Sequence, residues 1–334
     1  MAEAPQQVAA KTGVHSFTEE TLPPVLKNAL LGSLVTGEDH PLIVVHSDTK
    51  LTDALKLFRE HKILSAPVLD VKEKLFLGTL DLFDIMSFIA FIPYFEREER
   101  KKQYFEIKGE LLDNTTVSEL HFMHRVKRRQ LYCFDKDSSL ARSLHHFAEG
   151  VHRGIIATNC GFEIKDRYRI LSQFDVLSFV HEHAEEVGDL LQHTLEDLGM
   201  ASRAEGINVL HCSASDDALH GFGIIYSNNV NGIAVVDEKD AIVANLSTYD
   251  LSSIDGSSLE QLCSNVIKFL DSQYEGKGHP QPVTVVSTDT LAATISKMVN
   301  ASVHRVWVVD SANRPTAVVT MSDILRAIAP KKEE

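Results

Sequence analysis

Short apolar runs alternate with helix-spaced apolar positions along this chain of 334 residues. Runs of four to six residues rich in Val and Ile, bounded by turn residues, are typical of buried strands. The helical segments between them begin near Ser, Thr or Asp, whose side chains accept hydrogen bonds from the first N–H groups of a helix. The pattern predicts small sheets covered by helices.

The order strand, helix, strand, strand, helix occurs four times. In each copy, an alanine that begins the first helix is followed 30 to 34 residues later by an Asp that opens the last helix. The alanines are Ala54, Ala141, Ala218 and Ala292, and the closing residues are Asp84, Asp175, Asp250 and Asp323. An internal repeat of this regularity predicts that one structural unit is built four times.

The repeats can be bounded from the linkers between them. We assign repeat one to residues 14–95, repeat two to 115–184, repeat three to 200–256 and repeat four to 278–330. Residues 1–13 are expected to form a disordered tail. The linkers are charged and favour helices.

Motifs at the end of the repeats carry a family resemblance. Repeats two, three and four contain LSQFD, LSTYD and TMSD, and repeats two and four contain VHR before the central strand. These features resemble the CBS repeat. Four such repeats without an attached enzyme resemble the γ regulatory subunit of the AMP-activated and sucrose-nonfermenting protein kinase family and its γ-like relatives in plants and protists. The resemblance implies an α/β (α+β) fold in which repeats one and two, and repeats three and four, pair into two Bateman modules that form a flattened disc.

The resemblance also implies which side chains would meet a nucleotide. In the family, the closing Asp accepts hydrogen bonds from ribose hydroxyls, and the Ser or Thr three residues earlier lies near the ribose and phosphate. A carboxylate is an acceptor-only group, and a ribose offers two adjacent donors. The alternative is that each Asp only caps its helix. Carried over, the ribose-side residues are Asp84, Asp175, Asp250, Asp323, Ser172, Ser247 and Thr320.

Phosphate contacts are implied for two His-Arg pairs. The pairs are His152 with Arg153 and His304 with Arg305. Arginine binds phosphate through a planar fork of donors, and histidine titrates near neutral pH. The alternative is that these are surface residues paired with acids.

Repeats one and three depart from this pattern. Repeat one has Asp81 where Ser or Thr is expected, and Leu64-Ser65 where a basic residue is common. Repeat three has Asn231-Gly232 in place of His-Arg, although family pockets borrow basic groups from a neighbouring repeat. We therefore expect nucleotide at the Asp250 and Asp323 pockets first, then at Asp175, and last at Asp84.

Composition narrows the classes of partner. The net charge of −14 argues against nucleic acid as a general partner. The four cysteines form no C-x-x-C pair, which indicates a reduced, intracellular chain without a zinc site. No stretch is long and apolar enough to predict a membrane span. The basic run at 125–129 could line a phosphate channel, dock an acidic partner or direct nuclear import, and is most simply a solvated linker.

These observations lead to a functional prediction with an alternative. The sequence contains no Walker loop, nucleophile elbow or metal-ligand spacing, so we expect no enzyme, catalytic cofactor or metal. We predict a regulatory subunit that binds AMP, ADP and ATP and modulates a complex of a kinase catalytic subunit and a β-type scaffold subunit. We expect it in the cytoplasm, with the nucleus as an additional location. The alternative is a γ-like scaffold that binds a kinase or phosphatase without sensing nucleotide.

Overall fold

Two compact units make up the protein. The computed structural model describes residues 17–18, 20–35, 42–90, 98–123, 131–157, 168–201, 209–274 and 278–330. Unit 1 draws its described residues from the ranges 43–131 and 210–281, and unit 2 from 6–42, 132–209 and 282–334. The strands of repeats one and three therefore lie in unit 1 and those of repeats two and four in unit 2, whereas the described residues within 14–42 and 200–209 belong to unit 2 and those within 115–131 to unit 1.

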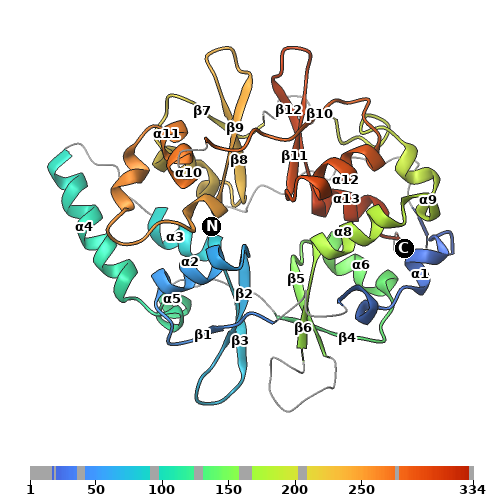
Figure 1. Cartoon of the computed structure of the whole chain (residues 1–334), viewed down its shortest axis with the longest axis horizontal. Helices are drawn as coiled ribbons and strands as arrows, with labels where there is room; N and C mark the ends of the chain where they lie inside the picture. The colour runs from blue at the N-terminus through green and yellow to red at the C-terminus, as the bar shows by residue number, and fades with distance from the viewer. Residues whose placement is uncertain are drawn as a thin grey trace, which may run out of the picture. The chain divides into compact units, whose positions relative to one another are not determined.

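Unit 1 contains two copies of the predicted element order (Figure 1). Repeat one consists of β1 (Val45–His46), α2 (Leu51–Glu60), β2 (Ser65–Leu69), β3 (Phe76–Asp81) and α3 (Leu82–Ala90). Repeat three consists of β7 (His211–Ser213), α10 (Ala218–Ser227), β8 (Gly232–Val236), β9 (Ile242–Ser247) and the 3-10 helix η3 (Thr248–Leu251).

Unit 2 contains the other two copies. Repeat two consists of β4 (Tyr132–Asp135), α6 (Leu140–Ala148), β5 (Arg153–Ala157), β6 (Tyr168–Ser172) and α8 (Gln173–Glu182). Repeat four consists of β10 (Thr284–Val285), α12 (Leu291–Asn300), β11 (Arg305–Val309), β12 (Pro315–Thr320) and α13 (Met321–Ile328).

Each repeat forms its own three-stranded sheet. The first strand is parallel to the second, and the second is antiparallel to the third. The sheet orders are β1-β2-β3, β4-β5-β6, β7-β8-β9 and β10-β11-β12. In β9, buried Ile242, Ala244 and Leu246 alternate with less buried residues, which is the period-two pattern of a strand with one face on the core.

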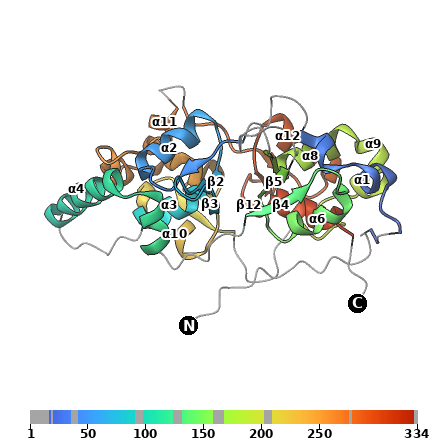
Figure 2. The ribbon, with the colours of Figure 1, turned by 90° about the horizontal axis from the view of Figure 1, so that it is seen from below.

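Helices outside the β-α-β-β-α elements complete each unit (Figures 1 and 2). Those in unit 1 are α4 (Glu98–Asn114), α5 (Val117–Met123), η4 (Leu259–Cys263) and α11 (Val266–Gln273). Those in unit 2 are α1 (Pro24–Asn28), η1 (Leu31–Val35), α9 (Ala184–Val187) and η2 (Asp189–Gln192). Leu30 forms a β-bridge with Ser139, so the segment that precedes β1 packs against repeat two.

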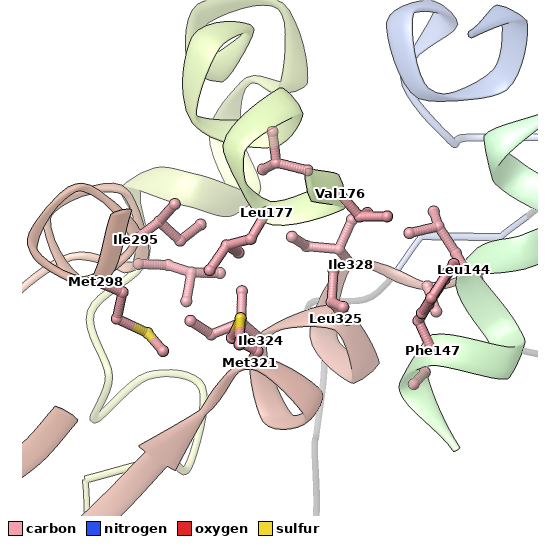
Figure 3. Close-up of a cluster of buried hydrophobic side chains, with 14 of the residues drawn as sticks. Leu144, Phe147, Val176, Leu177, Ile295, Met298, Met321, Ile324, Leu325 and Ile328 are labelled. Atoms are coloured by element: carbon pink, nitrogen blue, oxygen red, sulfur yellow. The ribbon is translucent and has the colours of Figure 1, made fainter. Parts of the chain in front are cut away.

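A separate hydrophobic core lies in each unit. In unit 1, Phe58 and Phe222 are buried in one cluster, and in unit 2, Phe147 is buried in the other. Figure 3 shows the unit 2 core, where side chains of α6, α8, α12 and α13 meet. Burying each large aliphatic or aromatic side chain contributes about 1.5–3 kcal/mol, so these helix faces fix the pairing of repeats within a unit.

The predicted fold class of four β-α-β-β-α repeats is confirmed, with one correction. We expected every repeat to close on a helix opened by its Asp, but repeat three closes on the single 3-10 turn η3. Ser252, Ser253 and Gly256 follow this turn, and such residues favour turns over helix. The pairing of repeats one with two and three with four concerns how the two units join, and it stays a prediction.

Candidate functional site

The closing Asp of three repeats is held in a capping box. In each box, one carboxylate oxygen (Oδ2) accepts a hydrogen bond from the backbone N–H and from the hydroxyl of the residue three positions earlier. The N–H and hydroxyl distances to Oδ2 are 2.7 and 2.7 Å for Ser172 and Asp175, 2.7 and 2.9 Å for Ser247 and Asp250, and 2.9 and 2.6 Å for Thr320 and Asp323. The predicted Ser/Thr–Asp pairs therefore do meet, and each pair fixes the start of a helix.

The second carboxylate oxygen is also engaged in repeats three and four. Arg326 Nη1 lies 2.9 Å from Asp323 Oδ1, and Arg326 Nη2 donates to the carbonyl of Ala148 in repeat two. The Tyr274 hydroxyl lies 3.4 Å from Asp250 Oδ1. Burial and the negative charge of Asp250 raise the pKa of Tyr274. A ribose at either Asp would therefore compete with a partner from the same chain.

In repeat one, a second carboxylate replaces the hydroxyl. The Asp81 N–H donates to Asp84 Oδ2 at 2.9 Å, and the Asp84 N–H donates to Asp81 Oδ1 at 3.0 Å. Asp caps helices as well as Ser or Thr does, which explains why the substitution preserves the fold. Both carboxylates are buried, and together they make this turn unsuited to a phosphorylated ligand.

The backbone places each His-Arg pair beside a capping box. Arg153 pairs with Ser172 across β5 and β6, and Arg305 pairs with Thr320 across β11 and β12. The first residue of the closing helix donates its N–H to the carbonyl of the histidine, at 3.0 Å for His152 and 3.3 Å for His304. Repeats one and three make the same bond with Leu64 and Asn231, at 2.9 and 3.1 Å.

All four predicted phosphate residues come together in unit 2. Although solvent reaches the His304 ring, the surrounding protein partly desolvates it, and this lowers its pKa to about 4. The positive charges of Arg305, Arg153 and His152 add to the effect. His304 thus lies in a positive field to which both repeats contribute, and such a field attracts anions.

Direct contacts join repeats two and four near this cluster. The buried Gln173 amide donates to the Phe147 carbonyl at 2.8 Å and to the Ser322 hydroxyl at 2.9 Å. The rings of Phe174 and His304 lie 6.4 Å apart. Gln173 and Phe174 therefore keep the starts of α8 and α13 together.

Unit 1 has different chemistry at the equivalent positions. Leu64-Ser65 and Asn231-Gly232 replace the His-Arg pairs, as the sequence predicted. Arg59 of α2 acts on this region, because its charge opposes the rise in the pKa of Tyr249 that burial causes. Sequence reasoning overlooked Arg59, Arg326 and Tyr274. Of these, only Arg326 has a recognisable signal, because it lies three residues after Asp323 on one helix.

Other sequence predictions concern metals, membranes and the basic run. Among the residues that the structure describes, no cluster of three or more His, Cys, Asp or Glu could hold a metal ion. None of the helices in the described ranges is long and apolar enough to cross a membrane. The basic run at 125–129 lies outside the described residues.

Comparison with known families and structures agrees with this architecture. The model of the CBS domain matches residues 38–91 and 279–330, which are repeats one and four. The chain contains CBS domains. Among solved structures, the CBS-domain chain is similar to MJ1225 from Methanocaldococcus jannaschii, described as a proposed archaeal homologue of g-AMPK, with 16% identity and a TM-score of 0.65 over 90% of this chain and 100% of that chain. An uncharacterized protein from Pyrococcus horikoshii aligns over the same shares with 12% identity and a TM-score of 0.50. At these identities the likeness concerns the fold.

Curated relatives carry another name. Protein sds23 of Neosartorya fischeri is 27% identical over 298 residues, covering 84% of this CBS-domain chain and 53% of the relative. SDS23 of Candida albicans is 23% identical over 320 residues, covering 85% of this chain and 49% of the relative. The chain therefore spans about half the length of these relatives, and their name differs from that of a kinase γ subunit.

Proposed function

We propose that this CBS-domain protein is a non-catalytic regulatory scaffold, which binds a protein kinase or phosphatase whether or not nucleotide is present. The observation that carries this proposal is the engagement of Asp250 and Asp323, the two carboxylates ranked first for ribose, by Tyr274 and Arg326. The capping boxes use the other oxygen of each carboxylate. The closing Asp residues thus have a complete structural role without a ligand.

Two further observations support the scaffold. Unit 1 lacks His-Arg pairs at the positions where unit 2 has them. The curated relatives are named Sds23, whereas the likeness to a proposed g-AMPK homologue has only 16% sequence identity. The kinase or phosphatase as a partner class comes from the family resemblance alone.

A pull-down with the purified full chain tests the scaffold. Candidate kinases and phosphatases would be quantified on the chain without nucleotide and with millimolar AMP or ATP. We expect the retained amount to stay constant, and to stay constant also in the Arg153→Ala, Arg305→Ala double variant. A retained amount that changes with nucleotide, or the absence of any retained kinase or phosphatase, would refute the scaffold.

A second candidate function is favoured by the positive cluster of unit 2. In this case AMP, ADP or ATP would place its phosphates near His152, Arg153, His304 and Arg305, and the chain would modulate a kinase catalytic subunit with its β-type scaffold subunit. The lowered pKa of His304 gives this candidate a signature. A bound anion stabilises the protonated ring, so binding would take up a proton and tighten as the pH falls.

Calorimetric titration separates the two candidates. Under the second, AMP, ADP or ATP would bind in the micromolar range, more tightly at pH 6 than at pH 8. Binding would be lost in the Arg153→Ala, Arg305→Ala variant. The Asp250→Ala, Asp323→Ala variant tests the ribose contacts separately. If none of the three nucleotides gives a heat of binding at millimolar concentration, the second candidate is refuted and only the scaffold remains.

A further inference from the structure

An exposed apolar stripe runs along α4. It consists of Tyr104, Ile107 and Leu111, spaced i, i+3 and i+7, and we call it the α4 stripe. Ile107 is 52% exposed and Leu111 is 43% exposed, while Tyr104 is half-buried and packs in part against the unit 1 core. This is the spacing of a seam that packs against another helix.

Another face of α4 is already used. Phe105, Gly109 and Leu112 are buried against unit 1, where α4 lies beside α2 and η4. In Figures 1 and 2, α4 lies at one edge of unit 1. The stripe is therefore a second apolar face on a helix whose first face holds it on the unit.

Other exposed apolar side chains do not form such a pattern. Among the described residues, the other large ones are Leu30, Val71, Leu75 and Val286, and none of them lies in a helix. Singly exposed apolar residues are common on protein surfaces. Apolar residues that recur on one helix face mark an interaction surface.

The charges around the stripe indicate what it binds. Glu106 and Glu110 are exposed on the adjoining side of α4. Lys108 points back to the unit, since its Nζ donates to the Phe88 carbonyl at 3.0 Å and lies 4.6 Å from the centre of the Phe88 ring. Among the α4 side chains that the structure describes (104–114), those that border the stripe on this side are therefore acidic.

We propose that the α4 stripe docks an amphipathic helix of a protein partner, whose apolar face is bordered by Lys or Arg. This deepens the proposed function and rests on it, because the partner would be a component of the kinase or phosphatase. Helix docking onto an apolar face is a recurring recognition mode. The opposite charges at the border would fix the orientation of the helix and raise the association rate.

The helix that carries the α4 stripe is held in place before any partner binds. The Gly256 N–H donates to Asp113 Oδ1 at 3.2 Å, and Gly109 lies so close to the Gly256 backbone that no Cβ atom would fit between them. A preformed surface loses little conformational entropy when it binds. Docking therefore requires ordering of the partner helix only.

A synthetic peptide serves as the probe. It has about 21 residues, with Leu at the a and d positions of three heptads and Lys at most others. One comparison peptide replaces Lys with Glu, and another replaces Leu with Ala. Binding to the full chain is followed by fluorescence anisotropy near physiological ionic strength, where interactions between distant surface charges are screened.

The decisive variant is Leu111→Lys, and its control is Val286→Lys, which makes the same change of charge at a side chain that is 45% exposed. We expect Leu111→Lys to lower the affinity for the Leu-Lys peptide by about tenfold or more, because roughly one apolar anchor contact is lost. Val286→Lys should leave binding unchanged. A Glu106→Lys, Glu110→Lys variant should bind the Leu-Lys peptide more weakly than wild type does and the Leu-Glu peptide more tightly.

Several outcomes would overturn the proposal. Equal binding to wild type and Leu111→Lys, equal loss in Val286→Lys, or binding of the Ala-Lys peptide as tight as that of the Leu-Lys peptide would indicate a general attraction to an acidic protein. Sedimentation of the chain alone adds a check. A dimer of wild type that is lost in Leu111→Lys would assign the stripe to a second copy of the chain instead.

The pull-down separates this inference from the proposed function. If wild type and Leu111→Lys retain a kinase or phosphatase equally, the α4 inference fails and the scaffold stands. If the Leu-Lys peptide binds the stripe but no kinase or phosphatase is retained, the scaffold fails and the docking surface stands.

Discussion

The junction of α4 with the loop around Gly256 should tolerate no side chain at position 109. In a Gly109→Ala variant, the new Cβ would overlap the Gly256 carbonyl oxygen and lie 3.0 Å from its carbonyl carbon. Cβ atoms are not found closer than 3.0 Å to another heavy atom. Both atoms at Gly256 belong to the backbone, so neither can rotate away, and either α4 or the loop must move.

The magnitude follows from two opposing effects. Overpacking of a close contact costs about 1–3 kcal/mol, and a rigid backbone neighbour places this case in the upper part of that range. Alanine in a helix interior regains about 0.5–1 kcal/mol relative to glycine. The net expectation is therefore a loss of about 1–2 kcal/mol in the free energy of unfolding.

The matched control is Gly223→Ala in the interior of α10. A Cβ at position 223 meets no atom within 4 Å, so only the helix preference acts, and a gain of up to about 1 kcal/mol is expected. Urea unfolding would be followed by far-UV circular dichroism, because the single tryptophan, Trp307, lies in unit 2 and α4 lies in unit 1. A Gly109→Ala variant as stable as wild type, or two variants that shift in the same direction, would refute the packing argument.

Two further predictions concern unit 2. Gln173→Leu should cost about 1–3 kcal/mol in urea unfolding monitored by Trp307 fluorescence, because the Phe147 carbonyl and the Ser322 hydroxyl oxygen both lose the buried amide that donates to them. An unchanged midpoint would show that these bonds make no net contribution to stability. The pKa of His304 is lower in the folded chain than in the unfolded chain, so the unfolded chain takes up this proton first as the pH falls. The contribution of the neutral ring to the free energy of unfolding is therefore complete above about pH 6.5 and declines as the pH falls towards 4. His304→Gln should therefore flatten the acid side of the stability profile, and an identical profile in both proteins would contradict this.

Much of the fold could be predicted from local pattern. The apolar runs and the alanine-to-Asp interval indicated the four copies of the element order, and each closing Asp does lie in the first turn of its closing helix. The end of repeat three could not be inferred in the same way, because the apolar residues after Asp250 continue at helical spacing although η3 ends at Leu251. Turn-forming serines decide this end, and their effect depends on the packing around them.

The partners of the predicted site residues were harder to infer. A carboxylate at a helix start can cap, bind ribose or pair with a cation, and sequence alone does not choose among these roles. Arg326 lies within reach of Asp323 by simple helix geometry, but Tyr274 reaches Asp250 across 24 residues. Such a contact depends on tertiary packing, which residue spacing does not encode.

The two units combine one backbone plan with different side-chain chemistry. The carbonyl before the central strand accepts the same hydrogen bond in all four repeats, yet it belongs to histidine in unit 2 and to Leu64 or Asn231 in unit 1. An anion would therefore act on unit 2, whereas the α4 stripe belongs to unit 1.

An anion can alter docking at the stripe only if the two units are energetically coupled, and the docked helix must then alter anion affinity by the same factor. Anisotropy titrations of the Leu-Lys peptide with and without ATP, matched by ATP titrations with and without the peptide, measure that factor from both sides. A factor of one in both would make unit 2 irrelevant to docking, which is what a scaffold without nucleotide sensing requires.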